Sequence, residues 1–85
     1  MKTKLVLTTE KNETEQWTVL PFIPRIDDWF NVKDIFTDEE IDNIRKSASE
    51  WSGEIGKVRS VIYRHDDNEF YVEVKIWCED KSLVS

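Results

Sequence analysis

The strict alternation of apolar and polar residues near the end of the chain is the feature that most constrains its fold. Successive side chains of an extended chain point to opposite faces, so alternation predicts a strand with one buried face. Segment 69–79 is therefore a predicted strand, and segment 57–64 pairs with it as a β-hairpin across residues 65–68. One face of this strand carries Phe70, Val72, Val74 and Ile76, and the other carries Tyr71, Glu73, Lys75 and Trp77.

Two registers of this hairpin fit the sequence. A three-residue turn places Val58 and Ile62 on the buried face of the first arm. A two-residue turn places Val61 and Tyr63 there instead, because a slip of one residue moves every side chain to the other face. A bend in the strand would bury part of both sets, and the sequence allows all three arrangements.

A capping box predicts a helix over residues 37–51. Thr37 and Glu40 have the spacing at which each side chain satisfies a backbone N–H of the first helical turn. Phe36 precedes the cap and, with Ile41, forms the pair of a hydrophobic staple. The apolar residues then recur at spacings of three, four and three, as on one face of a helix: Ile41, Ile44, Ala48 and Trp51.

The first third of the chain predicts two strands that pair as a hairpin, at 4–9 and 16–23. Pro21 has no N–H to give to a sheet, so the second strand is expected at an edge or at a bulge. A third, short strand is expected at 29–32, after an acidic turn at 27–28. The predicted order is thus strand, strand, strand, helix, strand, strand, which is mainly β with one helix (α+β).

We expect a single domain over residues 1–79 and a frayed tail at 80–85. The proline-led acidic turn into a strand, the strand opened by Gly56-Lys57-Val58 and the turn at 66–68 resemble the pattern of SH3-like small barrels. The resemblance covers roughly residues 15–78, is generic and points to no single family. It implies a strongly bent antiparallel sheet that closes as a barrel, and an open antiparallel sheet packing one helix is the alternative.

Composition narrows the class of partner. Eighteen Asp and Glu against 12 Lys and Arg give a net charge of −6, and nucleic-acid binding normally needs a clustered basic face. Cys78 is the single cysteine, which excludes an intramolecular disulfide and a cysteine-based zinc site. No window has the apolar length of a membrane span or of a signal peptide's core. We therefore expect a cytoplasmic chain that does not enter a membrane.

No residue pattern predicts an enzyme. His65 lies beside Asp66 and Asp67, which would suit a shared metal or proton, but turns favour Asp for its backbone preferences. The acids at 27–28 are read as a turn cap, and Cys78 as a small buried residue. We expect no catalytic residue, no metal ligand and no cofactor.

The aromatic residues carry the functional hypothesis. Tyr71 and Trp77 lie on the face of the last strand opposite its apolar residues, and Trp17 and Trp29 are on strands of unknown partners. Either the helix with Trp51 covers these rings, or they form an exposed patch of the kind that marks an interface. We expect a non-enzymatic interaction module that binds a protein partner or its own copy through these aromatics or a sheet edge near Pro21.

A second hypothesis is a nucleic-acid-associated accessory domain. Small barrels stack single-stranded bases on aromatic rings beside basic groups. Here those groups would be Lys57, Arg59, Arg64 and Lys75, which must converge near Tyr71 or Trp77. An acidic mimic of nucleic acid is the remaining variant of this hypothesis, and a net charge of −6 favours it only weakly.

Overall fold

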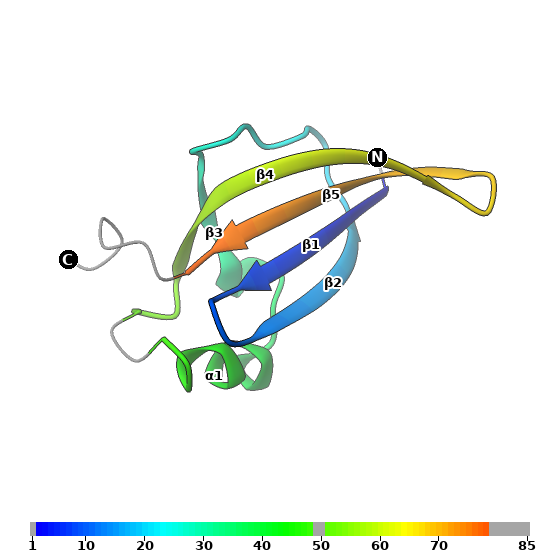
Figure 1. Cartoon of the computed structure of the whole chain (residues 1–85). Coiled ribbons are helices and arrows are strands. Elements are labelled where there is room, and N and C mark those ends of the chain that lie inside the picture. The colour runs from blue at the N-terminus through cyan, green and yellow to red at the C-terminus, as the bar shows by residue number, and fades with distance from the viewer. Residues whose placement is uncertain (1, 49–50, 79–85) are drawn as a thin grey trace.

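The computed structural model describes residues 2–48 and 51–78 of the 85-residue chain. In these residues, five strands form one mixed sheet, in the order β2-β1-β5-β4-β3. The strands make up 51% of the described residues, and the sheet curls through 238° into a half-barrel (Figure 1). The elements are β1 (Lys2–Thr8), β2 (Glu13–Val19), β3 (Trp29–Asn31), the 3₁₀ helix η1 (Val32–Asp34), α1 (Asp38–Arg45), β4 (Ile55–Asp66) and β5 (Glu69–Trp77).

The predicted class, mainly β with one helix, and the predicted order of elements are confirmed. The expectation of an antiparallel sheet is wrong at one pairing, because β1 lies parallel to β5. Local patterns cannot reveal this pairing, since it joins the two ends of the chain. In the described part of the sheet β2 and β3 are the edge strands, so the sheet stops at a half-barrel. The predicted tail at 80–85 lies outside the described residues.

The core lies between the inner face of the curled sheet and α1, which packs below the sheet in Figure 1. Leu5 and Leu7 of β1 point to this inner face, and Ile41 and Ile44 of the helix meet them in one buried cluster. Full burial of each such side chain contributes about 1.5–3 kcal/mol. Three predicted core residues of β5 join the same cluster: Val72, Val74 and Ile76.

The predicted capping box is present at the start of α1. The Glu40 backbone N–H donates to Thr37 Oγ1 at 3.2 Å, and the Thr37 N–H donates to Glu40 Oε1 at 2.9 Å. Phe36 and Ile41, the predicted staple pair, are both buried in the core. The start of the helix is therefore set by local sequence.

The end of α1 differs from the prediction. The helix ends at Arg45, and single turns follow, with the Ala48 N–H donating to Arg45 O and the Trp51 N–H donating to Ala48 O. Ala48 and Trp51 are still buried, so the apolar spacing identified core residues but not a continuous helix. Residues 49 and 50, which the prediction placed in the helix, lie outside the described residues. None of the helices in the described residues is long and apolar enough to cross a membrane.

The β4–β5 hairpin combines the two registers that the sequence allowed. A two-residue turn at Asp67 and Asn68, with φ of 48° and 65°, closes it and pairs Tyr63 with Val72. A bulge between Val58 and Ser60 then shifts the pairing by one residue. Val58 consequently points into the core, as the other register required.

The remaining predicted strands are present with shifted bounds. β2 is an edge strand and ends at Val19, before Pro21, as the missing N–H of proline requires. The acidic turn precedes β3, where Asp27 has φ of 76° and the Asp28 carboxylate accepts the Arg25 N–H at 2.9 Å. Asp28 thus caps the backbone, as predicted. β3 ends at Asn31, because η1 begins at the next residue.

Candidate functional site

Trp17 and Tyr71 form one aromatic group on the outer face, the face of the sheet turned away from α1. Their rings meet edge to face, with centroids 5.0 Å apart and planes at 66°. The ammonium groups of Lys2 and Lys4 lie 5.0 and 6.0 Å from the Trp17 ring centroid. Cations at these distances are attracted to the ring face. Trp17 is 48% exposed and Tyr71 is half-buried.

Trp29 and Trp77 form a second aromatic group on the same face. Lys57 of β4 lies in register between them, opposite Trp29 of β3 and Trp77 of β5. The Lys57 ammonium is 5.9 Å from the Trp29 ring, and the Arg59 guanidinium is 4.6 Å from the Trp77 ring. Trp29 is 56% exposed, whereas Trp77 is half-buried.

The helix does not cover these rings. α1 and Trp51 belong to the buried cluster on the inner face, so the four predicted aromatic residues stay partly exposed on the outer one. Of the two predicted alternatives, covering by Trp51 or an exposed patch, the structure has exposed rings, in two groups. Each group is flanked by basic side chains.

Three of the four basic residues predicted to converge lie near the same rings. Arg59 covers Trp77, Lys57 lies beside Trp29, and Arg64 is opposite Tyr71 in the β4–β5 ladder. Lys75, on β5 between Tyr71 and Trp77 in sequence, is half-buried.

Much of this basic charge is already neutralised. The Arg64 side chain hydrogen-bonds to Glu73, whose 8% exposure makes it a buried acid, and this bond raises the pKa of Arg64. Lys4 pairs with Glu15 at 3.1 Å and has its pKa raised by that carboxylate. The outer face therefore presents less free positive charge than a count of its basic residues suggests.

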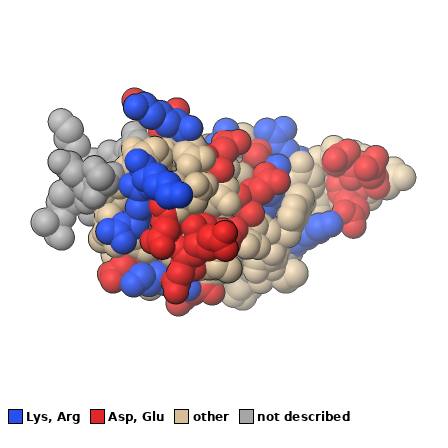
Figure 2. All heavy atoms as spheres, turned by 90° about the horizontal axis from the view of Figure 1, so that it is seen from below, with Lys and Arg blue, Asp and Glu red and all other residues tan. Residues whose placement is uncertain are grey.

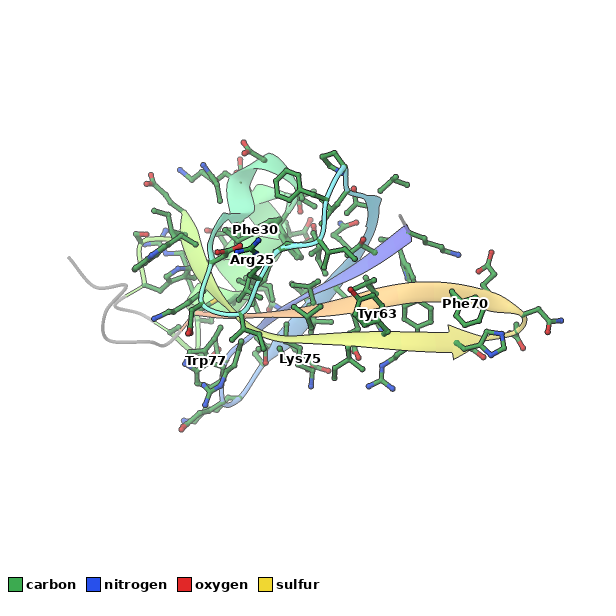
Figure 3. The ribbon with its side chains drawn as sticks, turned by 90° about the horizontal axis from the view of Figure 1, so that it is seen from above. Arg25, Phe30, Tyr63, Phe70, Lys75 and Trp77 are labelled. Carbon is green, nitrogen blue, oxygen red and sulfur yellow. The ribbon has the colours of Figure 1, made fainter. Side chains whose placement is uncertain are left out.

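The most exposed aromatic residues of the sheet lie elsewhere, on the part of the β4–β5 hairpin that projects past its neighbours. We call residues 60–71 the hairpin arm. Tyr63 is 69% exposed and Phe70 is 76% exposed, and Figure 3 shows both on the arm, away from Phe30 on the body. The His65 ring stacks on Phe70 with centroids 4.4 Å apart.

The inner face of the arm is a continuation of the core face without a cover. Tyr63 lies opposite Val72, and His65 lies opposite Phe70, so these side chains share the face that is buried farther along the hairpin. The sequence placed Phe70 with the apolar face but missed its exposure. The predicted strand lengths indicated this exposure, because a hairpin over 57–79 extends beyond flanking strands as short as 4–9 and 29–32.

A second apolar surface lies at the proline loop between β2 and β3. Phe22 is 73% exposed, and with Trp29, Phe30 and Ile35 it lines a hollow of about 210 Å³. Asp28 and Asp34 also line it. This hollow is small for a ligand pocket, which typically encloses about 300–1,000 Å³.

The candidate chemical residues are dispersed. His65 is exposed on the arm and Cys78 is buried in the core. Within residues 2–48 and 51–78, no three His, Cys, Asp or Glu side chains are grouped closely enough to hold a metal ion.

Acidic side chains gather in two regions of the surface. Figure 2, which views the molecule from the helix side, shows one group on the face toward the viewer and another at the end that carries the hairpin turn. The exposed acids of these two regions are Asp38, Glu39 and Asp42 on α1, and Asp66, Asp67 and Glu69 at the turn.

Comparisons of the chain with protein-family models, with curated proteins and with solved structures found no match. The likeness to small barrels is a loose likeness of shape, based on a curled sheet with one packed helix. The function is therefore inferred from the surfaces of the molecule, among which the hairpin arm is an exposed continuation of the core face.

Proposed function

We propose that this chain is a non-enzymatic interaction module that binds a protein surface, either a partner or a second copy, through its hairpin arm. The observation that carries the proposal is the exposure of Tyr63 and Phe70 on a face that is core elsewhere in the same hairpin. Covering such a face by a bound protein lowers the free energy, because removing apolar surface from water is favourable.

The arm has the composition of a protein–protein interface, with aromatic rings surrounded by polar residues. Two exposed aromatic rings present on the order of 300 Å² of apolar surface, and aromatic residues are enriched among the residues that dominate binding energy. Acidic residues surround the rings at the turn, as polar residues surround the centre of most interfaces. Isolated exposed apolar residues are common, but two on one projecting face form a patch.

The predicted outer-face aromatics support this function less strongly than the arm does. Arg59 covers the Trp77 ring, and Tyr71 contacts Trp17 edge to face. These rings already have partners within the chain, so a binding partner would have to displace those contacts. Trp29, the most exposed of the four, borders the hollow at the proline loop.

Binding of single-stranded nucleic acid is the weaker candidate. Arg64 is engaged by buried Glu73, and the arm ends in acidic residues that repel phosphate. A net charge of −6 adds to that repulsion. Binding to a single-stranded oligonucleotide that weakens steeply with added salt would favour this candidate over the arm.

Matched serine substitutions test the proposal. Tyr63→Ser with Phe70→Ser removes the arm surface, whereas Phe22→Ser removes an equally exposed ring from the proline loop. We expect the double variant to lose self-association in sedimentation and stoichiometric capture of a partner from the native host, with unfolding unchanged. The Phe22→Ser variant should keep both. Equal behaviour of the double variant and the wild type would refute a role for the arm.

A further inference from the structure

The hairpin arm has an open strand edge in addition to its apolar face. β3 pairs with β4 only over Ile55–Lys57, and two backbone hydrogen bonds from the acidic turn extend this pairing to Val58. These bonds join Asp27 N to Val58 O at 2.8 Å and Val58 N to Asp28 O at 2.9 Å. From 60 to 66, β4 has a neighbour on one side only among the described residues. We call residues 60–66 the open β4 edge.

Three residues present their main chain at this edge. A two-residue turn is closed by a hydrogen-bonded pair, here Asp66 with Glu69, and alternate residues of an antiparallel strand bond to the same neighbour. The main chains of Val61, Tyr63 and His65 therefore face away from β5. Their N–H and C=O groups are positioned to pair with another strand.

The opposite edge of the sheet is protected. Along β2, Glu13 and Glu15 point outward, and Gln16 is held by Glu40 of the helix at 2.8 and 2.9 Å. Charged side chains and a covering helix are the usual means of blocking an edge. The open β4 edge carries the apolar run Val61, Ile62 and Tyr63, and its charged residues, Arg64 and Asp66, follow that run.

We propose that the open β4 edge pairs antiparallel with the same edge of a second copy, around a two-fold axis at Tyr63. This inference rests on the proposed function and assigns a second copy as the occupant of the arm. Two identical strands related by a two-fold axis perpendicular to the sheet run antiparallel, so each contact occurs twice. The two five-stranded sheets then join through the arms.

The edge is complementary to itself in length. The acidic turn that pairs with Val58 limits the edge at one end, and the hairpin turn limits it at the other. With Tyr63 on the axis, residues 60–66 of one copy lie opposite 66–60 of the other. Val61, Tyr63 and His65 of each copy would then exchange both backbone bonds, which gives six interchain hydrogen bonds.

The charges along the paired strands are compatible with this register. Ile62 lies opposite Arg64 and Ser60 opposite Asp66, so no two like charges are direct cross-strand neighbours, and the acidic hairpin turn of each copy ends beside the acidic turn at 27–28 of the other. Asp67 falls opposite Arg59 at the bulge. Within the described residues neither Arg59, which stacks on Trp77, nor Asp67 takes part in an ion pair, so the two-fold would bring the two into an ion pair twice.

The size of the contact predicts a weak dimer. Edge pairing brings together Tyr63 and Ile62 of the two copies and leaves Phe70, one strand away on β5, outside the contact, so the buried surface is below about 1,200 Å², in the range of weak interfaces. We therefore expect association in the micromolar range and a monomer on dilution.

Amide hydrogen exchange tests the pairing without any substitution. We expect the N–H groups of Val61, Tyr63 and His65 to gain protection as the chain is concentrated from low micromolar to millimolar. Those of Ile62 and Arg64, which bond to β5, serve as the internal reference and should be protected at both concentrations. Unchanged exchange at the three edge amides would overturn the inference.

A pair of substitutions at one position provides a second, independent test of the strand pairing. His65→Pro removes an edge N–H and blocks pairing, whereas His65→Ala keeps that N–H and loses the same ring. We expect His65→Pro to sediment as a monomer and His65→Ala to dimerise within about twofold of the wild type. A His65→Pro chain that dimerises like the wild type overturns the edge pairing. If it does so while Tyr63→Ser with Phe70→Ser abolishes association, the arm surface stands and only the strand pairing fails.

Discussion

Glu40 of α1 and Gln16 of β2 join the helix to the edge strand, with the Gln16 amide donating to both carboxylate oxygens at 2.8 and 2.9 Å. The same carboxylate accepts the Thr37 backbone N–H, so one side chain both caps the helix and docks it on the sheet. Partial burial works to raise the pKa of Glu40, but hydrogen bonds from Thr37, Gln16 and Thr14 together bring it below its ordinary value of 4.5.

The lowered pKa of Glu40 makes part of the stability dependent on pH. A carboxyl group whose pKa is lower in the folded chain stabilises the fold above its unfolded pKa, and this contribution is lost as pH falls through the folded pKa. Glu40→Gln should lower the free energy of unfolding by about 1 kcal/mol at neutral pH. Denaturant titrations should show this difference shrinking as pH falls below 4.5. A difference that stays constant down to acid pH would contradict the role of the carboxylate charge.

Gly56 lies where the sheet has no room for a side chain. A Cβ at this position would overlap the Ile76 Cγ2 methyl group. Gly56→Ala should therefore cost about 1–3 kcal/mol of stability, because the core must shift to accept a methyl group. Combining it with Ile76→Ala removes the obstructing methyl, so the two changes together should cost less than their sum in thermal unfolding. Simple additivity would show that the close approach is relieved in some other way.

The hairpin turn holds two residues in the left-handed region. Asp67 has φ of 48° and Asn68 has φ of 65°, a conformation that glycine adopts at no steric cost. Asn68→Gly should raise the unfolding free energy by about 0.5 kcal/mol, whereas Asn68→Val should lower it by about 1–2 kcal/mol. Melting temperatures of the two variants measure the contrast. An Asn68→Val chain as stable as the wild type would contradict the turn geometry.

Trp51 makes a partly buried hydrogen bond that the exposed tryptophans do not. Its indole N–H donates to Ile55 O at 2.6 Å, at the start of β4. Trp51→Phe should destabilise the fold by about 1–3 kcal/mol, because the Ile55 carbonyl loses its partner and the smaller ring leaves a gap in the core. Trp29→Phe, at an exposed position, should change stability by less than about 0.5 kcal/mol in the same denaturant titration. Equal effects of the two substitutions would contradict the placement of Trp51.

The local elements of this fold are readable from the sequence because their causes are local. Thr37 and Glu40 specify the helix start through backbone N–H groups within one turn. Alternation specifies β5, and the turn residues specify its partner. The end of the helix was missed because Ala48 and Trp51 keep helical spacing while the chain turns. A continuous helix and a series of single turns would both bury these two side chains, so their apolar character does not distinguish the two.

The features that depend on contacts between distant parts of the chain could not be predicted from local sequence patterns. The parallel pairing of β1 with β5 depends on how the two ends of the chain meet, and no residue within either strand records it. The bulge between Val58 and Ser60 combines two registers, each of which fits its own part of the hairpin. The predicted aromatic residues were found on the outer face, but the exposure of Tyr63 and Phe70 depends on where the flanking strands end.

Site-specific photo-cross-linking tests the central claim, the role of the hairpin arm, most directly. A benzophenone amino acid placed at position 63 or 70 reports what covers the arm, and the same group at position 22 serves as an equally exposed control. The account predicts a cross-linked product with a second copy or a partner from positions 63 and 70, and little from position 22. Cross-linking no stronger from the arm than from position 22 would contradict it.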